Sequence, residues 1–207
     1  MTTKKLIVIL GATGNQGGSV AEVFLQEPEW RVRAVTRNPL STKARALAAR
    51  GAEIVQADLN LPNTLSSAFE NAHAIFAVSD FWGLYGDPAN EAKATEDQPL
   101  NVWAANQETE QLKAVIDAVA KIPTLDRFVL SSLSNATKWS RGKYTHVYHF
   151  DSKAKAETYG RETYPELWKK TSIFQAGFFL SNFVSHPVFQ PQLVSPPLTA
   201  LTSPDNF

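Results

Sequence analysis

The stretch "KLIVILGATGNQGG", residues 5–18, decides the fold. Its first six residues form an almost continuous apolar run, which is typical of a parallel strand buried on both faces. The residues that follow place Gly11, Gly14 and Gly17 in a G-x-x-G-x-x-G pattern. Glycine permits a tight turn there and lets the backbone come close to a phosphate group. Because the loop stands between a strand and a helical pattern, it predicts a dinucleotide-binding site.

The rest of the chain continues this pattern. Short apolar runs alternate with helical periodicity, which indicates βαβ units and a parallel sheet. Further strands are expected at residues 31–36, 53–58, 74–79, 127–132 and 171–176. Helices are expected after the glycine loop, around residues 44–48, 65–69 and 112–119, and from Asp151 to about Thr163. The predicted fold class is therefore α/β, a Rossmann-like doubly wound parallel sheet with helices on both faces.

The composition excludes several classes of function. The 207 residues include 20 Lys and Arg against 20 Asp and Glu, so no charge excess favours direct nucleic-acid binding or an anionic membrane. The absence of cysteine excludes disulfides, thiolate catalysis and cysteine-ligated zinc, and we expect no metal site. The N-terminal apolar run is too short for a secretory signal or a membrane span. We therefore expect a soluble cytoplasmic protein, with the nucleus as the alternative.

The residue after the second expected strand bears on the choice of cofactor. An acidic side chain about 20 positions beyond the glycines would bind the ribose 2′-hydroxyl of NAD. This chain has Arg37 there, followed by polar groups in "TRNPLS", residues 36–41. A guanidinium suits the 2′-phosphate of NADP, because it makes charge-assisted and often bidentate contacts. The sequence thus predicts NADP(H), and the alternative is that Arg37 is a solvated surface charge.

Other ligand-facing positions follow from a rule for α/β sheets, in which ligands bind at the carboxyl ends of the strands. This rule selects Asp58, Leu59, Ser79, Asp80, Phe81, Ser131, Ser132, Gly177 and Phe178. Each of them can instead be a cap or a turn residue. The polar connection from Asp80 to about Asn101 is long for a compact domain, which favours a functional role. His73, just before a strand, is expected to be a surface or hydrogen-bonded histidine.

Five segments together resemble the NmrA-like proteins, an atypical branch of the short-chain dehydrogenases. They are "GATGNQGGSVAEVFLQ", "VRAVTRNP", "GAEIVQADLN", "HAIFAVSDFW" and "HFDSKAKAE", in that order, and the likeness extends from about residue 5 to residue 186. The resemblance implies a Rossmann domain that prefers NADP(H). The cofactor contacts it implies are Gly11, Ala12, Thr13, Gly14, Asn15, Gln16, Arg37, Asn38, Pro39, Leu40, Ser41, Asp58, Leu59, Ser79, Asp80, Phe81, Lys153, Gly177, Phe178, Phe179 and Leu180. Lys113 falls near a further family contact.

The same resemblance implies a domain organisation. Members of the family usually continue into a smaller C-terminal substrate or partner domain, which we expect to be largely absent here. Residues 1–186 are the expected NAD(P)-binding domain. Residues 187–207 are the expected proline-rich tail, or a truncated start of the C-terminal region.

The segment "HVYHFDSK", residues 146–153, bears on catalysis. Standard short-chain dehydrogenases carry a tyrosine four residues before the lysine, whereas this chain has His149 there and Tyr148 one residue earlier. A displaced role for Tyr148 stays open, and His149 is either an acid or a packing or capping histidine. Lys153 is the candidate catalytic residue, either as a cation that binds the ribose or as a general base.

The sequence leaves three interpretations of the function open. The first is an NADPH-dependent reductase of a small organic or secondary metabolite, which the family resemblance implies. The second is a non-catalytic NADP(H) redox sensor or transcriptional co-regulator that acts through a protein partner. A degenerate, unstable relative is the third and weaker interpretation.

Overall fold

The computed structural model of the chain describes residues 4–185 and 187–190. The chain divides into two compact units, Met1–Gln175 and Ala176–Phe207. The first unit holds the sheet, and the described part of the second holds the short helices α9 (Asn182–Ser185) and η3 (Pro187–Phe189). Most of the predicted tail, residues 187–207, lies outside the described residues, so the boundary expected after residue 186 stays a prediction.

The first unit is built on a six-stranded sheet with the strand order β3-β2-β1-β4-β5-β6. Every neighbouring pair of strands is parallel. The strands are β1 (Lys5–Leu10), β2 (Trp30–Thr36), β3 (Glu53–Gln56), β4 (Ala74–Ala77), β5 (Arg127–Ser131) and β6 (Thr171–Phe174). This order starts at β1 and winds outward in both directions, which confirms the predicted doubly wound fold.

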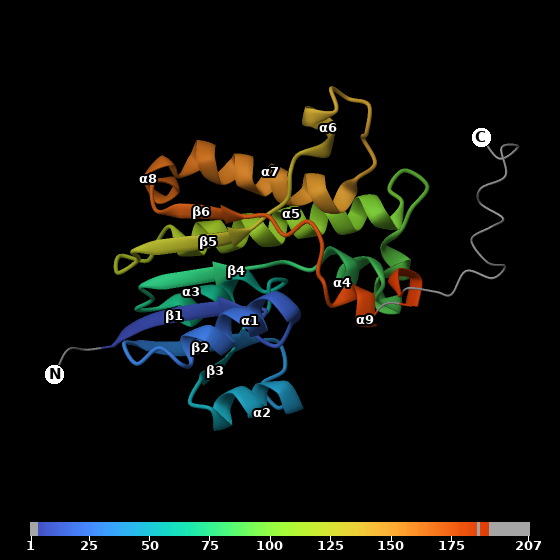
Figure 1. The fold of residues 1–207 in the computed structure, drawn as a ribbon. Coiled ribbons are helices and arrows are strands. Elements are labelled where there is room, and N and C mark those ends of the chain that lie inside the picture. The colour runs from blue at the N-terminus through green and yellow to red at the C-terminus, as the bar shows by residue number, and fades with distance from the viewer. Residues whose placement is uncertain (1–3, 186, 191–207) are drawn as a thin grey trace, which may run out of the picture. The chain divides into compact units, whose positions relative to one another are not determined.

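Helices cover both faces of the sheet, as Figure 1 shows. The helices of this unit are α1 (Asn15–Phe24), α2 (Thr42–Ala49), α3 (Leu65–Phe69), α4 (Phe81–Tyr85), α5 (Leu100–Val119), α6 (Ala136–Trp139), α7 (Tyr148–Thr163) and α8 (Pro165–Trp168), with the 3-10 turns η1 (Pro62–Thr64) and η2 (Pro88–Lys93). Gly51, after α2, has a φ of +99°, so it ends that helix in the left-handed conformation expected of a terminal glycine.

The apolar run of β1 explains the two layers of core. Leu6, Val8 and Leu10 pack in a cluster with residues of α3 and α5. Ile7 and Ile9 point to the opposite face and pack with residues of α1 and α2. Alternate residues of a strand face opposite sides, so a strand covered on both faces must be apolar throughout. Burial of each such side chain contributes about 1.5–3 kcal/mol.

Several element boundaries differ from the sequence expectation. Strands β3, β4 and β6 each end two residues early, so the predicted ligand-facing residues follow these strands instead of ending them. The connection after Asp80 is not wholly irregular, since it contains α4 and η2. Helix α7 begins at Tyr148, three residues before the expected start at Asp151.

Candidate functional site

The glycine loop joins β1 to α1 in the conformation that the sequence predicts. Gly11 has a φ of +66°, and the Gly14 N–H donates to the Gly11 carbonyl at 2.8 Å. A Cβ on Gly17 would lie 2.4 Å from the Gly11 oxygen, so only glycine fits there. Gly14 is the N-cap of α1 and provides no side-chain cap. The first N–H groups of α1 and the positive end of its dipole are therefore available to an anion.

A side-chain hydrogen bond joins the start of α1, just after the loop, to the end of β5. The Ser131 hydroxyl, at the end of β5, donates to the Gln16 side-chain carbonyl at 2.8 Å. Ala12 is buried, Thr13 and Gln16 are half-buried, and Asn15 is exposed. The structure thus brings the loop predicted after β1 and one of the serines predicted after β5 to the same edge of the sheet.

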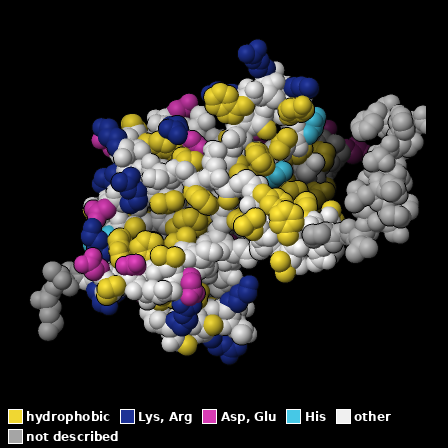
Figure 2. All heavy atoms as spheres, viewed as in Figure 1, with side chains coloured by type: hydrophobic (Ala, Val, Ile, Leu, Met, Phe, Trp, Pro, Cys, Tyr) yellow, Lys and Arg dark blue, Asp and Glu magenta, His cyan; other side chains and the backbone are white. Residues whose placement is uncertain are grey.

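The segment after β2 has one side chain free for a ligand. The Asn38 side chain accepts a hydrogen bond from the Leu40 N–H at 3.0 Å, and Ser41 caps α2 by accepting from the Ala44 N–H at 3.2 Å. Pro39 is half-buried. Arg37 is exposed, and within the described residues its guanidinium has no hydrogen-bond or ion-pair partner. Figure 2 shows other Lys and Arg side chains around α2, so this corner of the molecule is basic.

Four other predicted contacts have local structural tasks. The Asp58 side chain accepts from the Asn60 N–H at 2.9 Å and shapes the turn after β3, next to half-buried Leu59. The Asp80 side chain caps α4 by accepting from the Gly83 N–H at 2.9 Å. Phe81 is buried in an apolar cluster with two alanines of α5. These residues shape the edge of the sheet, and their place in a cofactor site stays a prediction.

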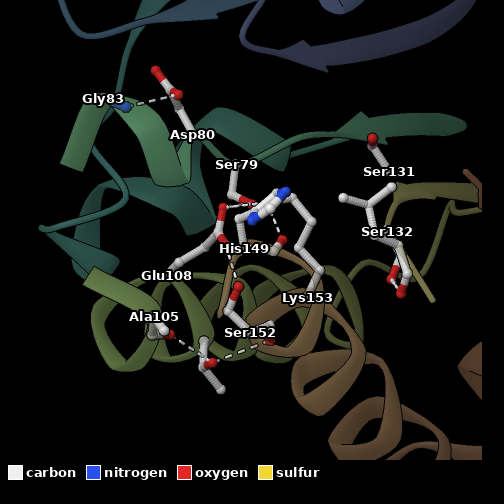
Figure 3. A network of polar contacts seen from close by, with 12 residues as sticks. Ser79, Asp80, Gly83, Ala105, Glu108, Ser131, Ser132, His149, Ser152 and Lys153 are labelled. Carbon is white, nitrogen blue, oxygen red and sulfur yellow. Dashed lines mark hydrogen bonds and ion pairs between the residues drawn. The ribbon is translucent and has the colours of Figure 1, made fainter. Parts of the chain in front are cut away.

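A buried ionic network lies beside the end of β4 (Figure 3). The Glu108 carboxylate, on α5, is fully buried, and its Oε1 accepts from the Lys153 Nζ at 2.6 Å. The same oxygen accepts from the Ser79 hydroxyl at 2.7 Å, and the Ser152 hydroxyl donates to Oε2. Thr109 fastens α5 to α7 by donating to the Ser152 carbonyl at 3.1 Å. Two predicted residues, Ser79 and Lys153, thus meet on one carboxylate.

The residue in the place of the usual tyrosine has a different environment. His149 lies one turn before Lys153, and its carbonyl accepts from the Lys153 Nζ at 3.4 Å. Its ring is tilted against Trp82, with centroids 4.9 Å apart. Burial, followed by the nearby Lys153 charge, lowers the pKa of His149, so its ring is neutral at neutral pH. Tyr148 is the first residue of α7 and packs against the cluster around Phe81.

Sequence reasoning missed Glu108. A signal for it was present, because Glu108 stands four residues before Leu112 and so extends the apolar stripe of α5. A charged residue on a buried helix face requires a partner.

Two other expectations concern single residues. Lys113 lies on another part of α5, where it pairs with Glu110 at 2.7 Å and lines an open depression of about 440 Å³ with Tyr159. His73 is hydrogen-bonded as expected, since its Nδ1 accepts from the Leu6 N–H at 3.2 Å.

The remaining expectations concern the predicted contacts in the second unit, membrane-spanning helices and metal sites. Gly177, Phe178, Phe179 and Leu180 belong to the second unit, and their role in the site stays a prediction. Among residues 4–185 and 187–190, no helix is both long and apolar enough to cross a membrane. Over those same ranges, no group of His, Asp or Glu side chains is arranged to hold a metal ion.

The fold and the glycine loop define a Rossmann-like protein, and the sequence comparisons give the family. Residues 3–206 match the NmrA-like family, to which this chain belongs. A relative from Aspergillus hancockii, the NmrA-like family domain-containing oxidoreductase hkm9, is 34% identical over 182 residues, which are 88% of this chain and 49% of that protein. The oxidoreductase lnaB of Aspergillus flavus is 33% identical over 187 residues, or 89% and 50%. The chain spans about half the length of these curated relatives.

Solved structures support the fold. The negative transcriptional regulator NmrA aligns with a TM-score of 0.66 and 22% identity over 86% of this chain and 47% of NmrA. A complex of NmrA with NADP aligns with a TM-score of 0.65 at 22% identity, covering 86% of this chain and 46% of that one. A complex with NAD gives 0.60 at 23% identity, covering 78% and 43%. At this identity the likeness shows the fold.

Proposed function

We propose that this chain binds NADP(H) along the carboxyl edge of its sheet and takes part in reducing a small organic substrate. The observation that carries the proposal is the arrangement of three features in one row. Arg37 follows β2, the glycine loop follows β1, and the Ser79–Glu108–Lys153 network follows β4. These three strands are neighbours in the sheet. Such a row suits a dinucleotide, with the pyrophosphate at the loop and a ribose at each side.

The preference for NADP(H) rests on Arg37. Its guanidinium is exposed and uncommitted to any acidic side chain of the described structure. A 2′-phosphate would supply the missing anion through charge-assisted hydrogen bonds. Curated relatives in the family are named oxidoreductases, and NmrA has been solved with both NADP and NAD. The family therefore supports a nicotinamide dinucleotide, and Arg37 supports the phosphorylated form.

Titration of the purified protein with NADPH and NADH tests this preference. In the variant Arg37→Gln we expect the dissociation constant for NADPH to rise about tenfold or more, which corresponds to loss of a charge-assisted contact. The constant for NADH should stay within about twofold, because that cofactor has no 2′-phosphate. Arg127→Gln is the matched control, since Arg127 is exposed at the opposite end of the strands. An unchanged ratio of the two constants in Arg37→Gln would contradict NADP preference.

Turnover is tested separately with NADPH and a panel of quinones and enones, by following the absorbance of the cofactor. Oxidation of NADPH above the background rate supports the reductase. Tight binding of NADPH without turnover on any member of the panel would count against it.

A second candidate is a sensor that binds NADP(H) without turnover. The observation that favours it is the neutral His149, which stands where the usual proton donor would be and packs against Trp82. A sensor must have different affinities for a partner protein in its NADP⁺-bound and its NADPH-bound form. A pull-down with each cofactor form should recover a partner in one state only, and equal recovery in both would exclude sensing.

A further inference from the structure

Glu108 is the most deeply buried charged side chain near the proposed cofactor site. Its residue exposure is 0%, and it lies among the buried residues of α5. A carboxylate in such a place is stable only when its oxygens are paired and hydrogen-bonded. Both oxygens of Glu108 are used: Oε1 accepts from Ser79 and Lys153, and Oε2 accepts from Ser152. The side chain is therefore held in one orientation by donors from two segments, the residues that follow β4 and helix α7.

The ion pair in turn fixes Lys153. The Lys153 ammonium has three N–H donors, of which one goes to Glu108 at 2.6 Å and one to the His149 carbonyl at 3.4 Å. The third has no acceptor among the residues that the structure describes. A lysine side chain is flexible, and the pairing with Glu108 restricts its rotamers before any ligand binds. Lys153 thus offers one fixed donor at the edge of the sheet.

The strand order tells which end of a dinucleotide would meet that donor. The order β3-β2-β1-β4-β5-β6 places Arg37, after β2, and Ser79, after β4, on opposite sides of the glycine loop. If the 2′-phosphate of the adenosine half lies at Arg37 and the pyrophosphate lies at the loop, the other half of the ligand must extend toward Ser79 and Lys153. That half carries the nicotinamide and its ribose.

We propose that Glu108 is a positioning residue for the nicotinamide half of the cofactor. It acts through Lys153, whose ammonium it holds in one position, and the hydroxyls of Ser79 and Ser152 fix Glu108 in turn. This role rests on the proposed binding of NADP(H) and adds a residue to it. A network that served only to join α5 to α7 would affect all ligands of the fold equally, whereas a positioning role affects only ligands that reach Lys153.

Two ligands separate these roles. NADPH carries both halves, and adenosine 2′,5′-bisphosphate carries the 2′-phosphate but lacks the nicotinamide and its ribose. In Glu108→Gln we expect the dissociation constant for NADPH to rise about tenfold, a change of 1.4 kcal/mol, while that for the bisphosphate stays within about twofold. Glu166→Gln is the matched control, since Glu166 also pairs with a lysine at 2.6 Å but is exposed. Calorimetric titration measures all constants.

Each result decides the proposal. A rise for NADPH alone supports it. Equal weakening of both ligands makes Glu108 structural and overturns it, as does an unchanged constant for NADPH. If the wild-type protein binds neither ligand, the proposed function itself fails. Ser152→Ala removes the hydroxyl donor to Oε2 and keeps both charges. If Glu108→Gln does not fold, this variant replaces it, with an expected rise of about threefold for NADPH alone and the same overturning results.

Discussion

The substitution Lys153→Met is the sharpest probe of the buried ion pair. The Glu108 and Lys153 side chains are 0% and 10% exposed, so water screens their charges little. At the Nζ–Oε1 distance of 2.6 Å and an effective dielectric constant of about 20, their attraction is about 6 kcal/mol. Glu108 keeps two hydroxyl donors after the substitution, which offsets part of this loss. We expect the free energy of unfolding to fall by about 3–5 kcal/mol, the usual cost of leaving a buried charge unpaired.

A double variant separates loss of the pair from loss of the lysine itself. In Glu108→Gln with Lys153→Met neither charge of this pair remains, so we expect about 2 kcal/mol or more of the stability to return. Lys169→Met is the control, because Lys169 pairs with Glu166 at the same 2.6 Å while both side chains are more than two-thirds exposed, at 70% and 81%. That substitution should change the free energy of unfolding by less than about 1 kcal/mol.

Urea unfolding followed by circular dichroism at neutral pH measures all of these variants. The reasoning fails if Lys153→Met costs no more than Lys169→Met. It fails equally if the double variant is no more stable than Lys153→Met, because the unpaired carboxylate would then not be the cause of the loss.

Two other predictions concern the glycine loop and the histidine. Gly17→Ala should lower the free energy of unfolding by about 1–3 kcal/mol and weaken NADPH binding, because its Cβ would meet the Gly11 carbonyl oxygen at 2.4 Å. Gly18→Ala, where the nearest atom is 3.4 Å away, is the control and should be tolerated in urea unfolding and NADPH titration. NMR titration should find the pKa of His149 below its usual 6.5, because burial disfavours the charged ring. The unfolded chain then takes up the proton first as the pH falls, so stability decreases as the pH falls below about 7, and His149→Asn should make this decrease smaller in urea unfolding.

The fold could be predicted from the sequence because its signals are local. The continuous apolar run at Lys5–Leu10 and the glycines after it specify a buried strand and a tight turn without reference to the rest of the chain. Helix α4 was missed because five residues are too few to show a helical period. Its start depends on Asp80, whose side chain caps the helix at Gly83. The ends of β3 and β4 were placed too late because apolar residues, Ala57 and Val78, follow the last residues that pair with a neighbouring strand.

The site was predicted less completely, since its central contact joins residues far apart in the sequence. Glu108 is 29 positions from Ser79 and 45 from Lys153, and no local pattern couples them. The sequence predicted Lys153 as a ribose-binding residue from its resemblance to the lysine of the short-chain dehydrogenases. It could not show that the ammonium is already paired with a carboxylate that has no contact with water.

The ion pair between Lys153 and Glu108 bears on whether Lys153 is a ribose-binding cation or a general base. A general base must direct a free electron pair toward its substrate, whereas the Lys153 Nζ donates to the Glu108 carboxylate and to the His149 carbonyl. The cationic, ribose-binding role is the one that these contacts favour.

His149 stands in the place of the usual tyrosine, and because its ring is neutral it is a poor proton donor. Hydride transfer to a simple ketone produces a strongly basic alkoxide that needs such a donor at once. Hydride transfer to a quinone produces a hydroquinone monoanion, a phenolate of pKa near that of tyrosine, about 10, which water can protonate afterwards. If the chain is a reductase, the loss of the tyrosine therefore favours conjugated acceptors over simple ketones.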